Sequence, residues 1–206
     1  MVATSTKEHW DRIYTDLSPE KVSWYQKEPA LSLEMIHHSG LEKDGLIIDI
    51  GGGASVLVDR LLDEGYRNVA VLDLSAHALA HAKQRLGQKA GQVEWIEADV
   101  TGVALSRVYD LWHDRAVFHF LTEANDRKHY LGTMRRGVRT GGHVIIATFT
   151  VGGPTKCSGL DIVQYDAQKL SGELGPEYAL LEQKAELHVT PMGKEQKFCY
   201  FLFRRV

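Results

Sequence analysis

The sequence predicts an α/β protein with a doubly wound, mostly parallel seven-stranded sheet, helices on both faces and a C-terminal antiparallel hairpin. The first observation is a short apolar stretch at residues 46–50, followed at once by three glycines and a helical pattern. The second is that further apolar runs alternate with helical patterns along residues 68–149. The third is an alternating pattern at residues 178–203, interrupted by a Pro-Gly turn.

Composition limits the class of protein. The chain has 206 residues, enough for one domain with its own core, and a formal net charge of −3, which gives no sign of a broad nucleic-acid surface. Its two cysteines, Cys157 and Cys199, form neither a disulfide framework nor a metal motif, as expected in a reducing compartment. No apolar run reaches the length of a membrane span. We therefore expect a cytoplasmic protein without membrane or nucleic-acid partners.

Residues 1–40 are predicted to form an N-terminal helical arm, and residues 41–206 the main domain. The arm begins with a short helix that carries Trp10 and Tyr14 on one face. It continues with the adjacent aromatics Trp24 and Tyr25 in a polar loop. These two side chains either pack the arm onto the domain or form part of a lid over a ligand.

A glycine turn follows the first predicted strand. The strand ends at Asp49 and Ile50, the three glycines are Gly51, Gly52 and Gly53, and Ser55 is a candidate N-cap for the next helix. Strand, glycine turn and helix start are typical of a loop that binds a nucleotide-type ligand.

The same stretch narrows the choice of ligand. The third glycine of the dinucleotide fingerprint is replaced by Val56, and no Gly-Lys-Ser/Thr triplet follows. The carboxylate of Asp49 would repel a pyrophosphate and would suit a cationic ligand. In these residues the chain resembles the first motif of the class I S-adenosylmethionine-dependent methyltransferases.

Two further strands also end in an acid, which strengthens this resemblance. Asp73 lies 24 residues after Asp49, and Asp99 follows the third strand. The resemblance implies that Asp73 accepts hydrogen bonds from the ribose hydroxyls of S-adenosylmethionine and Asp99 one from the adenine amino group, with Leu74 and Val100 beside them. Alternatively, Asp73 is merely solvated in front of a helix capped by Ser75. If Trp24 belongs to a lid, its aromatic face would attract the cationic sulfonium.

The fourth strand resembles the fourth motif of the family from Tyr109 to Leu121. Many small-molecule members have Asn where this chain has Arg115. We expect Asp114 and Arg115 to contact the cofactor, with Arg115 close to its carboxylate. Arg115 could equally pair with Asp114 or Asp99 as a structural ion pair.

The reaction implied by the resemblance is an in-line displacement, after which S-adenosylhomocysteine leaves. A base is needed only if the nucleophile arrives protonated. His113, Asp114 and His119 are the candidates at the mouth of the site, and His119 is the predicted general base because it follows the strand end. The alternative for His119 is ordinary packing.

The acceptor is expected to contact Tyr25, Phe120 and Cys157. Cys157 lies in a long glycine-rich loop at residues 150–165, although it could be an ordinary half-buried cysteine. No metal is expected, because His77 and His81 stand four residues apart on a predicted helix without further ligands and are interpreted as a solvated face.

Four functions remain open from the sequence. A small-molecule methyltransferase is the preferred one. A protein-lysine methyltransferase is the alternative, because Trp10-Asp11-x-x-Tyr14 resembles the arm of the elongation-factor lysine methyltransferases, although their acidic stretch after the fourth strand is absent here. A non-catalytic S-adenosylmethionine-binding protein and a nicotinamide dehydrogenase complete the set.

Overall fold

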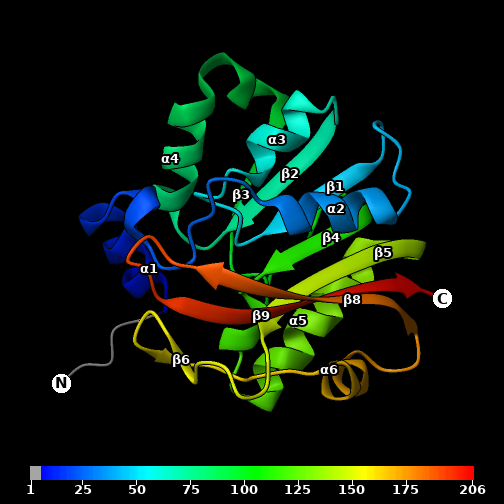
Figure 1. The fold of residues 1–206 in the computed structure, drawn as a ribbon. Helices are drawn as coiled ribbons and strands as arrows, with labels where there is room; N and C mark the ends of the chain where they lie inside the picture. Colours follow the sequence, from blue (N-terminus) through cyan, green and yellow to red (C-terminus); the bar gives the residue numbers. More distant parts are fainter. Residues whose placement is uncertain (1–5) are drawn as a thin grey trace.

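The computed structural model describes residues 6–206, so the first five residues of the predicted arm lie outside the described residues. Within this range the central sheet has seven strands in the order β3-β2-β1-β4-β5-β9-β8 (Figure 1). The strands are β1 (Leu46–Ile50), β2 (Asn68–Asp73), β3 (Val93–Glu97), β4 (Tyr109–Arg115), β5 (Val138–Phe149), β8 (Tyr178–Val189) and β9 (Glu195–Arg205). Strands β1 to β5 pair in parallel, while β9 runs antiparallel between β5 and β8. The predicted fold class is therefore confirmed.

Helices cover both faces of the sheet. One face packs on α2 (Ala30–His38), α3 (Leu57–Asp63) and α4 (Ala76–Leu86), and the other packs on α5 (Ala124–Gly137) and α6 (Ala167–Leu174). Alternation along β4 shows how the sequence makes two cores, because Leu111 joins the first cluster and Trp112 the second. This alternation later decides which face each polar residue of β4 can reach.

Smaller elements complete the chain. Helix α1 (Thr6–Asp16) lies beside α4, as Figure 1 shows. Short 3₁₀ turns are η1 (Pro19–Lys21), η2 (Gly87–Gln92) and η3 (Phe118–Phe120), and the loop after β5 contains a small hairpin of β6 (Lys156–Cys157) and β7 (Leu160–Asp161). No helix among the described residues is both long and apolar enough to cross a membrane.

The helix caps agree only partly with the sequence pattern. Asp166 caps α6, because its carboxylate accepts from the Lys169 amide. Ser55 does not occupy the cap position of α3, which is Val56; its hydroxyl accepts from the Leu57 amide instead. The glycine turn thus continues slightly further than predicted before the helix begins.

Candidate active site

A cavity of about 260 Å³ opens at the carboxyl ends of the first four strands. Its lining includes Gly51 after β1, Asp73 at the end of β2, Asp99 after β3 and Arg115 at the end of β4. In open α/β sheets ligands bind at this edge, where the strand order reverses. Helix α1 also contributes to the lining, opposite the strand ends; below, α1 is called the roof of the cavity and the strand ends its floor.

The glycine turn requires glycine for steric reasons. Gly51 has a φ of 67°, a left-handed conformation that other residues rarely adopt. A Cβ atom on Gly52 would lie 2.1 Å from Oδ2 of Asp49, and one on Gly53 would lie 2.6 Å from Oδ2 of Asp73. The backbone of the turn therefore packs directly against two strand-end carboxylates.

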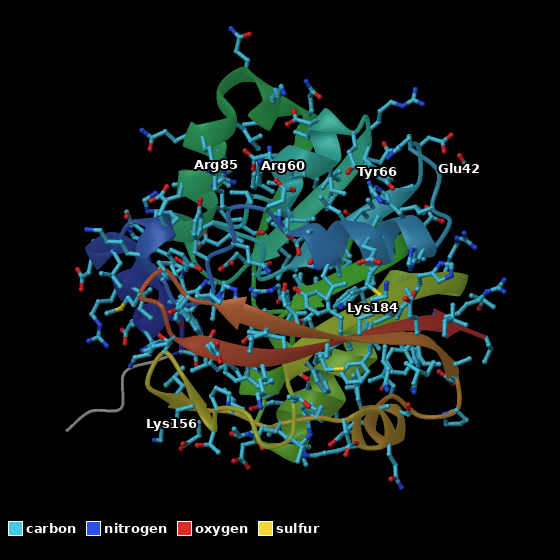
Figure 2. All side chains as sticks on the ribbon, in the orientation of Figure 1. Glu42, Arg60, Tyr66, Arg85, Lys156 and Lys184 are labelled. Atoms are coloured by element: carbon cyan, nitrogen blue, oxygen red, sulfur yellow. The ribbon has the colours of Figure 1, made fainter. Side chains whose placement is uncertain are left out.

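Arg85 of α4 holds the exit of this turn in place. It donates to the carbonyl oxygens of Ala54 and Ser55, at 3.1 and 2.6 Å, and forms an ion pair with Asp59 at 2.7 Å. Arg85 is labelled in Figure 2, where its side chain lies close to α3. A single guanidinium thus satisfies carbonyls that the irregular turn leaves outside any helix or strand.

Asp73 is buried and held by backbone amides. Its two carboxylate oxygens accept from the amides of Gly53 at 3.0 Å and Ser75 at 2.8 Å. Burial raises the pKa of Asp73 to about 6, despite these hydrogen bonds. Ser75 does cap α4 through its hydroxyl, so capping and a strand-end carboxylate coexist here.

Comparison with known proteins fits this architecture. Residues 47–142 match a family model described as a methyltransferase domain. The chain is also 24% identical over 97 residues to an eEF1A lysine and N-terminal methyltransferase of Danio rerio. That match covers 47% of this chain but only 14% of the relative, so the chain spans a small part of the relative's length.

Solved structures share the whole fold. One, from work on converting a disulfide bond into a thioacetal group during echinomycin biosynthesis, has a TM-score of 0.79 at 18% identity, with 98% of this chain and 92% of that chain covered. The N-methyltransferase NodS of Bradyrhizobium japonicum, in complex with S-adenosylhomocysteine, has a TM-score of 0.70 at 15% identity, covering 95% and 99%. Residues 47–142 thus match a methyltransferase domain, within a fold that the chain shares with solved S-adenosylmethionine-dependent methyltransferases.

Several residues predicted to contact the cofactor lie together in the cavity. Leu74, Asp99 and Val100 line it along with Asp73. The exposed carboxylate of Asp99 accepts from the amide and the hydroxyl of Thr101, at 2.8 and 2.7 Å, which fixes its orientation at the rim. Val100 is buried beside it and offers an apolar surface.

A smaller pocket of about 50 Å³ adjoins this region and is lined by Asp49, Gly52, Tyr25 and Arg115 among others. Two of its atoms are buried without a hydrogen-bond partner among the described residues: Oδ2 of Asp49 and Nη2 of Arg115. Buried polar atoms without a hydrogen bond are costly, so a ligand with an ammonium and a carboxylate would be stabilised by these two atoms.

The remaining contacts of Arg115 correct one expectation. Nε donates to the Tyr200 hydroxyl at 2.8 Å, Nη1 donates to the Trp24 carbonyl at 2.9 Å, and Nη2 lies 3.6 Å from a carboxylate oxygen of Glu186. The structural ion pair of Arg115 is therefore with Glu186 of β8, not with Asp114 or Asp99. Alternation along β4 sends neighbouring side chains to opposite faces of the sheet, which separates Asp114 from Arg115.

Asp114 lies behind the cavity, on the α5 face, and is not among the residues that line it. Its carboxylate accepts from the Tyr130 hydroxyl at 2.5 Å and from the amides of Val117 and Phe118 at 2.8 and 3.1 Å. Burial raises its pKa to about 6. The sequence predicts contact between Asp114 and the cofactor, whereas in this structure its side chain lies outside the cavity lining and holds the turn after β4.

The predicted position of His119 is also wrong. The ring is fully buried against Phe120 and Phe149, with centroid separations of 4.5 and 5.0 Å, and it does not line the cavity. Neither ring nitrogen has a hydrogen-bond partner among the described residues, and burial lowers the pKa to about 3. The residue follows the strand end as predicted, but the 3₁₀ turn η3 directs its side chain inward and leaves Phe120 at the cavity.

The other candidate base, His113, is buried as well. Both ring nitrogens are hydrogen-bonded: Nδ1 lies 2.7 Å from Oδ1 of Asp49, and Nε2 lies 2.9 Å from the hydroxyl of Ser32. It belongs to the smaller pocket and not to the cavity under α1.

The acceptor side is partly as expected. Phe120, Cys157 and Trp24 line the cavity, whereas Tyr25 lines the smaller pocket. Burial raises the pKa of the Cys157 thiol to about 12, so it is a neutral group. Trp10 stacks edge-on to Phe120 and to Trp24, at 5.0 and 5.6 Å between centroids.

Sequence reasoning missed how α1 is attached. Lys7 donates to the Leu74 carbonyl at 3.0 Å, and the Ser75 hydroxyl donates to Asp11 at 2.6 Å. His77 and His81 were predicted to be a solvated face, yet they contact Asp11 at 3.3 Å and the Tyr14 carbonyl at 2.8 Å, respectively. The Trp10–Tyr14 spacing was the signal that this face is used. Among residues 6–206 there is no cluster of three or more metal-ligating side chains.

Proposed function

We propose that this chain transfers the methyl group of S-adenosylmethionine to a nucleophilic atom of a small molecule held beneath α1, in the cytoplasm. The observation that carries the proposal is a pair of buried atoms without a hydrogen bond, Oδ2 of Asp49 and Nη2 of Arg115, from residues that line one small pocket beside the cavity of Asp73 and Asp99. An amino acid needs such a pair, because it carries an ammonium and a carboxylate on one carbon.

The residues fit the cofactor in order along the sheet edge. Asp49 would accept from the ammonium and Arg115 would donate to the carboxylate, while Gly51, Gly52 and Gly53 allow the close backbone approach. Asp73 would accept from the ribose hydroxyls, beside Leu74. Asp99 and Val100 would hold the adenine, the first through a hydrogen bond and the second through apolar contact.

Chemistry at this site depends on positioning and on the exclusion of water. Bound S-adenosylmethionine supplies a methyl group on a sulfonium, a strong electrophile with a good leaving group. Trp10, Trp24 and Phe120 form an aromatic wall that excludes water and offers ring faces to a cation. The turn after β4, fixed by Asp114, sets the distance between this wall and the glycine turn.

Enclosure favours a small acceptor. With α1 docked, the whole cavity amounts to about 260 Å³, at the lower limit of ligand pockets in general. The acceptor shares this space with the ribose and adenine of the cofactor, and Cys157 and Phe120 would bound the acceptor end. The original expectation that Tyr25 contacts the acceptor requires its loop to move, because Tyr25 faces the smaller pocket.

Protein-lysine methylation is the second candidate, favoured by the relative in Danio rerio and by the Trp10-Asp11-x-x-Tyr14 pattern. Arg115 opposes it, because its fixed positive charge lines the cavity where a lysine ammonium would have to enter. A long lysine side chain would also need an open channel beneath α1.

The test combines binding and turnover. Calorimetry should detect S-adenosylmethionine and S-adenosylhomocysteine, but not NAD, and binding of NAD instead would indicate a dehydrogenase. Labelled cofactor should then be offered with small thiols, amines and carboxylates and, in parallel, with lysine-containing proteins. Transfer to a small molecule supports the proposal; transfer to protein lysine alone would replace it by the second candidate. Tight cofactor binding without transfer to any acceptor class would point to a sensor.

A further inference from the structure

Three buried polar side chains from three elements form one continuous hydrogen-bonded chain beside the smaller pocket. Asp49 of β1 and His113 of β4 are direct partners in the parallel register, and Nδ1 of His113 lies 2.7 Å from Oδ1 of Asp49. Nε2 of the same ring lies 2.9 Å from the hydroxyl of Ser32 on α2. The side chains of Asp49 and His113 are each only 3% exposed.

The donors and acceptors of this hydrogen-bonded series of side chains can be assigned in part. An ionised carboxylate can only accept, so Nδ1 of His113 is the donor to Asp49, and Nε2 shares a hydrogen bond with the Ser32 hydroxyl. Every polar side-chain atom of the three is then used except Oδ2 of Asp49, which has no partner among residues 6–206. Serine, histidine and aspartate also form hydrolase triads, but there the free end is the serine. Here the free end is the carboxylate.

The free oxygen belongs to a residue that lines the smaller pocket. Asp49, His113 and Ser32 all line the smaller pocket, and Gly52 leaves room for Oδ2 because any Cβ there would lie 2.1 Å away. Rotation of the carboxylate would break its bond to His113, which is itself fixed at the other end by Ser32. The three hydrogen-bonded side chains therefore present one oriented, negatively charged acceptor to the pocket.

We propose that His113 and Ser32 are positioning residues that hold the Asp49 carboxylate for the ammonium group of the cofactor. This inference rests on the proposed function, since it assigns a ligand group to the same pocket. Selectivity for a ligand with an ammonium should then depend on His113 and Ser32, although neither touches the ligand's charge.

The experiment compares S-adenosylhomocysteine with its analogue that lacks the α-amino group, by calorimetry without any acceptor. The unaltered protein should prefer the amino compound by about 10- to 150-fold, the range of a hydrogen bond to a charged group. In His113→Leu this preference should fall to about threefold or less, while affinity for the des-amino analogue stays nearly constant. His113→Asn, which keeps a donor toward Asp49, should restore most of the preference.

Control variants separate positioning from general loss of structure. His188→Leu removes another buried histidine, one that contacts the Ser23 carbonyl at 2.8 Å, and it should leave the amino preference unchanged. Ser32→Ala should lower the preference by about threefold or more, and it decides the question if His113→Leu fails to fold. A preference unchanged in Ser32→Ala and in any folded His113→Leu would overturn the inference and leave the proposed function standing. If the unaltered protein binds neither compound, the proposed function itself fails.

Discussion

The indole Nε1 of Trp24 donates a hydrogen bond to the Tyr14 hydroxyl across 3.1 Å, which joins the loop before α2 to α1. Both side chains line the main cavity, and Arg115 holds the Trp24 carbonyl from below. The arm and the floor of the site are therefore connected through one residue. This connection makes the arm sensitive to what the cavity contains.

We expect the arm to become more protected when S-adenosylhomocysteine binds. Hydrogen exchange of amides across residues 8–28 should slow, because a ligand adds contacts under Trp10 and Trp24. Mass spectrometry with peptides from β8 as an internal control measures this directly. Unchanged exchange in the arm, with the ligand bound, would reduce the segment to packing.

Asp73→Ala should weaken binding of S-adenosylhomocysteine by about 1.5–3 kcal/mol, since the ribose hydroxyls lose a charged acceptor. Calorimetry at pH 7.5 measures the loss, with Glu94→Ala, which alters a carboxylate on β3 outside the cavity lining, as the control. Equal affinities for Asp73→Ala and the parent would remove Asp73 from ribose binding.

Affinity should also depend on pH through Asp73. Its pKa is raised to about 6, mainly by burial and further by the charges of Asp49 and Asp11, and only the ionised form can accept from both hydroxyls. Affinity should therefore fall as the pH drops below about 6, by up to about tenfold per unit. Asp73→Asn cannot titrate, so its weaker binding should lose this part of the dependence. A profile identical to that of the parent would assign the titration to another group.

Asp114→Ala should cost stability before it affects binding. The change leaves the Tyr130 hydroxyl and the amides of Val117 and Phe118 without their buried acceptor, a loss of about 2–4 kcal/mol in the free energy of unfolding. Urea unfolding measures it, and ligand affinity is then compared at temperatures where the variant is folded. If stability is unchanged but affinity collapses, Asp114 contacts the cofactor as the sequence predicted.

His119→Leu tests whether the buried imidazole is a base or packing. Because neither ring nitrogen has a partner among the described residues, an apolar side chain of similar size should leave stability at pH 7 unchanged or raise it by about 1 kcal/mol. Turnover by the variant should stay within about threefold of the parent if the imidazole only packs. Removal of a general base would instead lower turnover by about 10²–10⁴-fold. A loss of that size with unchanged cofactor affinity would restore His119 as the general base.

The same variant should alter acid stability. The unfolded chain takes up a proton near pH 6.5 and the folded ring only near about 3, so the unfolded state binds more protons between these values. Stability from this group is thus lost as the pH falls below 6.5, by up to about 1.4 kcal/mol per unit. His119→Leu should flatten the decline, as urea unfolding at pH 5 and 7 would reveal.

The strands, glycine turn and hairpin could be predicted because they depend on local patterns. Apolar runs that end in Asp49, Asp73 and Asp99 define three neighbouring strand ends, and parallel pairing brings such ends to one edge. The common location of these three strand ends could be predicted without knowing in which direction any side chain points. The prediction succeeded for the fold because periodicity is a property of the chain itself.

Side-chain direction after β4 could not be predicted in the same way. Ala116 has a φ of 72°, and this left-handed residue turns the chain so that His119 points inward and Phe120 faces the cavity. Similarly, the partner of Arg115 is Glu186, 71 positions later on the antiparallel strand β8. Long-range pairing of this kind depends on strand order and register, which a single sequence does not reveal.

The attachment of α1 on two sides of the cavity also bears on how fast the site can exchange its contents. Lys7 and Asp11 hold one side through Glu97 and Ser75, and His9 contacts Ser158 at 3.3 Å on the other. We expect a ligand beneath α1 to leave faster when one of these attachments opens, so its dwell time should depend on α1 as well as on affinity. The exposed Lys7–Glu97 pair, at 2.8 Å, weakens in salt. Release of a ligand from beneath α1 should then become faster as the ionic strength rises.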